Sequence, residues 1–157
     1  MKLLRIIDKA ISQFCEWCAL IFGCIMIVAA FLQVVMRFVF NDPLSWTEAV
    51  CRYSMVWFVF TAAGWGVKKY SHVRVDILLN ALSRKGQVWL QKFVGVVTII
   101  FAALLGYSGI LKVILQWNQI TPSLPLSYGV IYLAVPVFAV IAIFYATLQL
   151  FGLQDKL

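Results

Sequence analysis

The side chains that could do chemistry in this chain gather between Arg37 and Arg52, where both signs of charge lie between apolar runs. Residues 17–36 before this stretch and residues 53–67 after it carry no charge. Glu48 precedes Arg52 by four residues, the favourable order for an ion pair on a helix. We predict an Arg37–Glu48–Arg52 cluster at a membrane edge, with a structural or partner-facing role. The alternative is that the arginines only reach toward the lipid headgroups.

The other reactive side chains do not complete a catalytic or metal site. His72 is the only histidine, so the chain has no pair of axial histidines for haem. Cys15 and Cys18 lie one helical turn apart and could form a redox pair, but no second pair or nearby histidine makes a zinc site. We expect both cysteines to be small buried or interfacial residues. Without a nucleotide motif or a nucleophile–base set, we expect no enzyme activity, metal or cofactor.

The composition indicates an integral membrane protein. Hydrophobic residues make up 64% of the 157 residues and charged residues 12%, whereas soluble domains are nearer 45–50% apolar and about 25% charged. The net charge of +7 comes from basic residues placed between apolar runs, with no basic stripe among exposed aromatics. This pattern predicts contact with anionic lipids and no nucleic-acid partner.

The apolar runs predict an all-α membrane protein with four transmembrane helices in a single domain, residues 1–157. The predicted spans are residues 14–38, 45–67, 87–115 and 127–151. A 20-residue helix covers about 30 Å, the hydrocarbon thickness of a bilayer. The second apolar run is too short to span alone, so its helix must begin near residue 45 and include Glu48 and Arg52. Pro125 precedes the fourth span, and Pro136 inside it should produce a kink.

Two segments outside the spans are amphipathic. Residues 1–16 suit a helix on the membrane surface or a charged extension of the first span, and residues 73–82 suit a short interfacial helix. We expect His72 and Asp76 to orient the second segment. The basic residues number ten on one side of the membrane and three on the other, which places both termini in the cytoplasm.

Small residues predict how the spans pack. Ala62 and Gly66 share a helical face with Glu48 and Arg52, and a small-xxx-small pair lets another helix approach closely. We therefore expect this face to pack on protein, with Trp46 anchoring its depth. Similar pairs occur in the third span, Ala102 with Gly106, and in the fourth, Ala142 with Ala146.

The ordered set of motifs resembles the small membrane subunit of TRAP transporters, the tripartite ATP-independent periplasmic importers. Arg37 ends the first span, Trp46-Thr47-Glu48 with Arg52 opens the second, and Gly64 and Gly66 lie near its end. The other matching elements are His72-Val-Arg-Val-Asp76, Thr121-Pro-Ser-Leu-Pro125, Tyr132 and Pro136. One position departs from the family pattern, because Ala49 stands where a second acid often follows the first.

The resemblance implies a scaffold in the bacterial inner membrane. In this family a large membrane subunit carries the substrate and sodium sites and moves as an elevator. A periplasmic binding protein delivers an organic acid, commonly a C4-dicarboxylate or sialic acid. The small subunit would hold the large one in place, and its outer face could help dock the binding protein.

Two other functions remain compatible with the residues alone. One is a stand-alone four-span carrier in which Glu48 couples ion and substrate movement. The other is an anchor or assembly subunit of a membrane enzyme.

Overall fold

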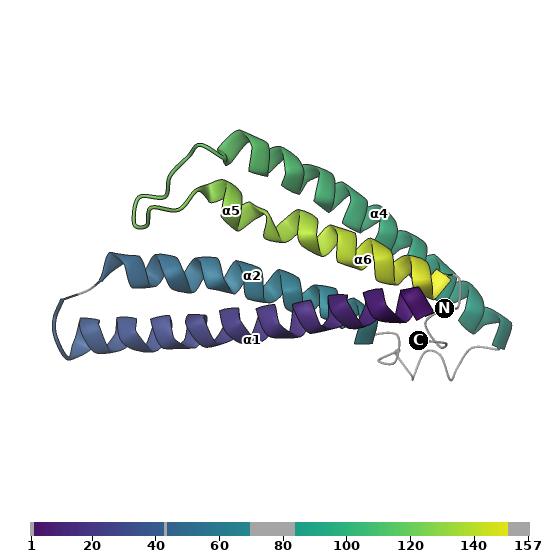
Figure 1. Ribbon diagram of the computed structural model, residues 1–157, viewed down its shortest axis with the longest axis horizontal. Coiled ribbons are helices and arrows are strands. Elements are labelled where there is room, and N and C mark those ends of the chain that lie inside the picture. The colour runs from purple at the N-terminus through teal and green to yellow at the C-terminus, as the bar shows by residue number, and fades with distance from the viewer. Residues whose placement is uncertain (1, 43, 70–83, 151–157) are drawn as a thin grey trace.

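The chain folds into two helical hairpins (Figure 1). The computed structural model describes residues 2–42, 44–69 and 84–150. The first hairpin pairs α1 (Lys2–Phe38) with α2 (Ser45–Lys69), and the second pairs α4 (Arg84–Gln116) with α5 (Tyr128–Tyr132) and α6 (Ala134–Leu150). Within the described residues the structure has no strand, only an isolated bridge between Ile120 and Ser127. The predicted all-helical class is therefore confirmed for this part of the chain.

The two hairpins converge at one end and separate toward the other (Figure 1). We call the end with the connections of residues 39–44 and 117–127 the turn end. The opposite end, where α1 begins and α2 and α6 end, is the terminus end. α2 lies between α1 and α6, so it is the helix through which the hairpins make most of their contact.

Three segments are long and apolar enough to cross a membrane, Leu4–Phe38, Lys92–Gln116 and Tyr128–Leu150. They identify the protein as a multi-pass membrane protein. The 25 residues of α2 measure about 37 Å, which is also sufficient. However, α2 is less apolar because it carries Glu48, Arg52 and Lys68 among its residues.

The N-terminal amphipathic segment is part of the first spanning helix. We had two expectations for residues 1–16, and the structure has the charged extension: α1 runs without a break from Lys2 to Phe38. A separate helix lying along the membrane surface is therefore wrong for the described residues. The physical reason is that Asp8 and Ser12 bond to side chains of α2 and α6, which keeps this part of α1 on the bundle.

Small residues allow α4 and α6 to pack closely. Ala102, Ala142 and Ala146 are all buried. A Cβ atom added at Gly106 would lie 2.7 Å from the Cβ of Ala139, well inside van der Waals contact. The small residues predicted in the third and fourth spans therefore do lie in the interior of the fold. On α2 the glycine that meets α6 is Gly64, whose added Cβ would lie 3.1 Å from Ile141, while Ala62 and Gly66 are half-buried.

The fourth predicted span is interrupted near Pro136. α5 ends at Tyr132 and α6 begins at Ala134. Pro136 has no N–H to donate to the Tyr132 carbonyl four residues earlier, so the ladder loses a bond where the interruption lies. The ladder resumes with the Val137 amide, which donates to the Leu133 carbonyl at 3.2 Å.

The connection between α4 and α5 is held by internal hydrogen bonds. The Thr121 hydroxyl donates to the Leu124 carbonyl at 2.6 Å, and the Thr121 amide donates to the Leu126 carbonyl at 2.9 Å. The Ser127 hydroxyl then caps α5 by accepting from the Gly129 amide at 3.0 Å. Pro125 is exposed within this closed turn.

Candidate functional sites: an exposed ion pair and a buried polar cluster

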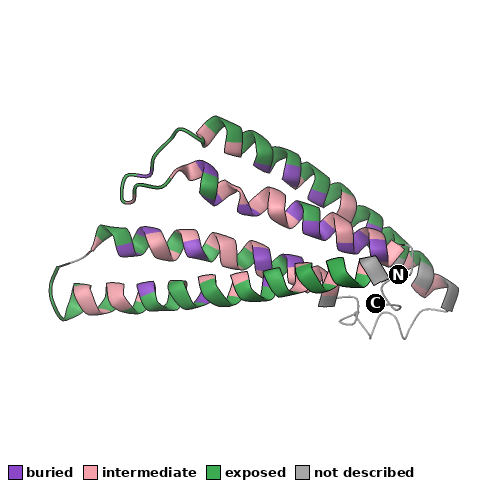
Figure 2. Ribbon diagram, in the orientation of Figure 1, coloured by how far each residue is buried: buried purple, intermediate pink, exposed green. Residues whose placement is uncertain are grey.

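Glu48 and Arg52 form an ion pair on the surface of α2. Their Oε1 and NH2 atoms are 2.5 Å apart, and their side chains are 59% and 67% exposed. Met55 and Val59 continue the same helical face and are also exposed. Among the described residues, exposed positions therefore recur on α2 along the half that lies toward the turn end, where Figure 2 colours parts of the ribbon green.

Arg37 lies apart from this pair. Its guanidinium carbon lies 5.7 Å from the centroid of the Phe38 ring, in a cation–π contact. In the described part of the chain, Arg37 makes no ion pair with Glu48. Of the three residues that we expected to cluster, the structure brings Glu48 and Arg52 together and leaves Arg37 apart.

The other sequence-predicted residues take different places. Trp46 is 42% exposed and lies in a pocket between α1 and α2. Pro125 lies in the α4–α5 connection, and Pro136 lies three residues after the interruption between α5 and α6. His72 and Asp76, with the amphipathic segment that contains them, lie outside the described residues.

A second charged group of residues, partly buried, lies between α1, α2 and α6 toward the terminus end. The Lys68 ammonium on α2 donates to the Asp8 carboxylate at 2.8 Å and to the Ser12 hydroxyl at 2.6 Å. The Asp8 side chain is only 13% exposed. The Ser12 and Tyr145 hydroxyl oxygens are 3.3 Å apart, and the ammonium lies 5.9 Å from the Tyr145 ring centroid. We call Asp8, Ser12, Lys68 and Tyr145 the polar cluster.

The sequence did not lead us to predict the polar cluster. The available signal was Asp8, an acid four residues before Ser12 in a segment otherwise rich in basic residues. Residues four apart on a helix share a face, so Asp8 and Ser12 could have been read as a polar face directed at a neighbouring lysine.

Among the four cysteines, Cys15 packs in the core. All four are free thiols. Cys15 is fully buried and packs in a core cluster with Ile141, Tyr145 and Leu148. This core lies directly beside the polar cluster, because Tyr145 belongs to both.

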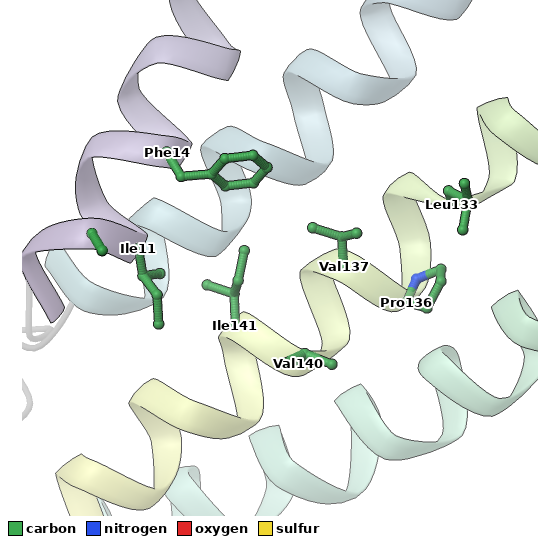
Figure 3. Close-up of a pocket in the computed structure, with 8 residues that line it drawn as sticks. Ile11, Phe14, Leu133, Pro136, Val137, Val140 and Ile141 are labelled. Atoms are coloured by element: carbon green, nitrogen blue, oxygen red, sulfur yellow. The ribbon is translucent and has the colours of Figure 1, made fainter. Parts of the chain in front are cut away.

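An apolar groove runs between α1 and α6, next to the polar cluster (Figure 3). It has a volume of about 560 Å³ and is lined on one side by Ala10, Ile11 and Phe14. Residues of α6 around Val137 and Ile141 line the other side. Because every lining residue is apolar, the groove offers no charge or hydrogen bond to an organic anion.

The family of the chain follows from comparison with known proteins. The model of a family described as "Tripartite ATP-independent periplasmic transporters, DctQ component" matches residues 26–155. The chain belongs to this DctQ family. The matched segment includes the exposed ion pair, Lys68 and Tyr145, whereas Asp8 and Ser12 precede it.

Several curated proteins share this DctQ similarity. The chain is 29% identical, over 85% of its length, to a small permease protein assigned to a TRAP transporter of Haemophilus influenzae, and covers 80% of that protein. It is 33% identical over 62% of its length to the C4-dicarboxylate TRAP transporter small permease protein DctQ of Vibrio cholerae, covering 39% of that protein. It is 31% identical over 59% of its length to the isethionate TRAP transporter permease protein DctMQ of Oleidesulfovibrio alaskensis, covering 15% of that protein.

Proposed function

We propose that this DctQ protein is a non-catalytic scaffold for the large membrane subunit of a TRAP transporter. The observation that carries the proposal is the Glu48–Arg52 pair, which is exposed on a helix of a membrane protein. The whole chain, residues 1–157, would act as one four-helix domain in the bacterial inner membrane.

The fourth span of this proposal is α2. The rings of Phe22 and Trp57 stack with centroids 5.4 Å apart, and a Cβ at Gly23 would lie 3.3 Å from Phe58. These contacts place the middle of α2 against the middle of the apolar run of α1. These contacts support the proposal that α2 crosses the bilayer beside α1.

The position of the Glu48–Arg52 pair along the bundle supports the proposal that another protein covers it. Trp46 and Val50 line a pocket with Val28 and Leu32 of α1, and both α1 residues lie within the uncharged run of residues 17–36. Glu48 and Arg52 are on the same turns of α2 as Trp46 and Val50 or on the next turn. The ion pair therefore lies at the same level along the bundle as apolar residues of α1. Charges that face lipid at such a level are costly and usually face protein instead.

We infer the remaining parts of the assembly from the family and its named members. The DctMQ relative is matched over 15% of its length, so a DctQ-like segment there belongs to a much longer permease. Named relatives transport C4-dicarboxylates and isethionate, which makes an organic acid the substrate class for this complex, with sialic acid as another candidate. Sodium would be the coupling ion, at sites in the large subunit. A periplasmic binding protein would dock from the turn end.

The proposed topology places the turn end outside and both termini in the cytoplasm. We expect a cysteine at position 123, in the exposed α4–α5 connection, to react with a membrane-impermeant maleimide in intact cells. A cysteine in place of Lys92 at the other end should react only after permeabilisation. The accessible native cysteines are replaced by alanine for this test. Labelling of position 92 alone in intact cells would invert the topology.

The scaffold proposal predicts what co-purifies with the chain. A mild-detergent purification from native membranes, analysed by mass spectrometry, should recover a large polytopic protein at equal stoichiometry. Glu48→Ala should lower the recovered partner several-fold, because Arg52 then meets the partner without its counter-charge. Glu16→Ala is the matched control, since it removes an exposed acid from α1, and it should leave the recovery unchanged.

Each other outcome has a definite meaning. Recovery of the unmodified chain alone would contradict the scaffold and favour a stand-alone carrier with Glu48 as its coupling acid. Recovery of an enzyme subunit would favour the anchor alternative. Equal recovery of the large partner with Glu48→Ala would keep the scaffold but exclude the ion pair as its contact.

A further inference from the structure

We propose that the polar cluster is a joint that sets how far apart the two hairpins lie at the turn end. This role belongs to the chain itself and goes beyond the proposed scaffold function. It does not depend on which partner or substrate the complex has.

The cluster connects both hairpins through directional bonds. Asp8 and Ser12 come from α1 and Lys68 from α2, so the ion pair lies within the first hairpin. Tyr145 comes from α6 in the second hairpin. Its hydroxyl oxygen lies 3.3 Å from the Ser12 hydroxyl and 3.5 Å from the Asp8 carbonyl oxygen, and its ring faces the Lys68 ammonium at 5.9 Å.

The apolar groove shows why these bonds matter for the angle between the hairpins. Directly beside the cluster, the space between α1 and α6 is a groove of about 560 Å³. Along this groove the side chains of α1 and α6 leave the space between them open, while Cys15 packs on Ile141 and Tyr145 next to it. Apolar packing therefore fixes the separation of α1 and α6 over only part of their length. Hydrophobic contact is also non-directional, whereas the hydrogen bonds of the Tyr145 hydroxyl have a preferred geometry. The charge-assisted bond from Lys68 holds the Ser12 hydroxyl that Tyr145 meets.

The contacts between the hairpins become fewer toward the turn end. The fully buried residues Cys15 and Tyr145 lie toward the terminus end, next to the cluster. Farther along, Phe60 and Phe138 pack with centroids 5.7 Å apart. Near the turn end, Tyr53 and Tyr128 meet edge to face at 6.4 Å. A small rotation at the joint is therefore amplified along the diverging hairpins of Figure 1.

The test measures the spread of the hairpins directly. Spin labels on cysteines at positions 45 and 123, both exposed at the turn end, report the distance between the hairpins by pulsed electron resonance in lipid nanodiscs. Cys18, Cys24 and Cys51 are replaced by alanine, and the fully buried Cys15 is retained. We expect one narrow distance distribution for the full chain.

Two variants remove the joint in different ways. The double variant Asp8→Asn with Lys68→Met removes the charges together, so neither is left unpaired. Tyr145→Leu keeps the ion pair and removes the contribution of α6, which keeps the proposal testable if the double variant does not fold. We expect either change to widen the distribution at least twofold in folded, monodisperse protein.

The control is the exposed ion pair. Glu48→Gln with Arg52→Met removes the same charges from an exposed pair whose two members both lie on α2, and it should leave the distribution unchanged. A distribution as narrow as that of the parent chain in the folded double variant, or in folded Tyr145→Leu, would overturn the joint. Equal widening in the control would also overturn it, because the effect would then follow from loss of any ion pair.

Discussion

Replacing Gly106 by leucine is expected to separate α4 from α6 and to lower the stability of the chain by about 3 kcal/mol or more, at the upper end for overpacking. Even a single added carbon at this position would lie 2.7 Å from the Cβ of Ala139. Ala139 is 3% exposed, and its side chain has no rotamer that could move away. The two backbones must therefore move apart, which also disturbs the contacts beside Ala102 and Ala142.

The matched control is Ala103→Leu, three residues earlier on the same helix. Ala103 is exposed among the described residues, so we expect added bulk there to be accommodated. Leucine is a better helix former than glycine, so a loss at position 106 cannot come from helix propensity. The measurements are the monodisperse fraction in mild detergent and the unfolding temperature. Equal behaviour of the two leucine variants would show that α4 and α6 do not pack through Gly106.

This interface illustrates what the sequence could predict. The spacing of Ala102 with Gly106 and of Ala142 with Ala146 depends only on helical periodicity, which local sequence determines. The helix ends at Phe38 and Gln116 and the helix start at Ser45 likewise lie within one residue of the predicted limits at residues 38, 115 and 45. The interruption near Pro136 could also be predicted, because proline has no N–H to donate to the carbonyl four residues earlier, whatever the tertiary fold.

The parts that the sequence did not predict depend on which helices become neighbours. Gly64 rather than Gly66 meets α6, because the rotation of α2 is decided by its packing on both α1 and α6. The polar cluster joins residues 8 and 145, and no local pattern reports a contact across that separation. Arg37 was expected beside Glu48 because both lie near the same turn, but its side chain lies over the Phe38 ring instead.

Replacing Lys68 by methionine is expected to cost about 2–3 kcal/mol of stability, somewhat less than the roughly 3–5 kcal/mol of a fully buried pair. The Asp8 carboxylate is 13% exposed, so it would lose its ammonium partner in a place where water compensates poorly. Asp8→Asn should cost less, because the Lys68 ammonium is 32% exposed and keeps its bond to Ser12.

A double-mutant cycle separates this pair from the exposed one. Asp8→Asn with Lys68→Met should cost less than the sum of the two single changes, giving a coupling of about 1–2 kcal/mol. The same cycle on Glu48 and Arg52 should give a coupling under about 0.5 kcal/mol, because that pair lies four residues apart on a single helix. Reversible unfolding in mixed micelles measures both. A coupling near zero for Asp8 and Lys68 would show that their bond forms without stabilising the fold, and the joint would then depend on the Tyr145 contacts alone.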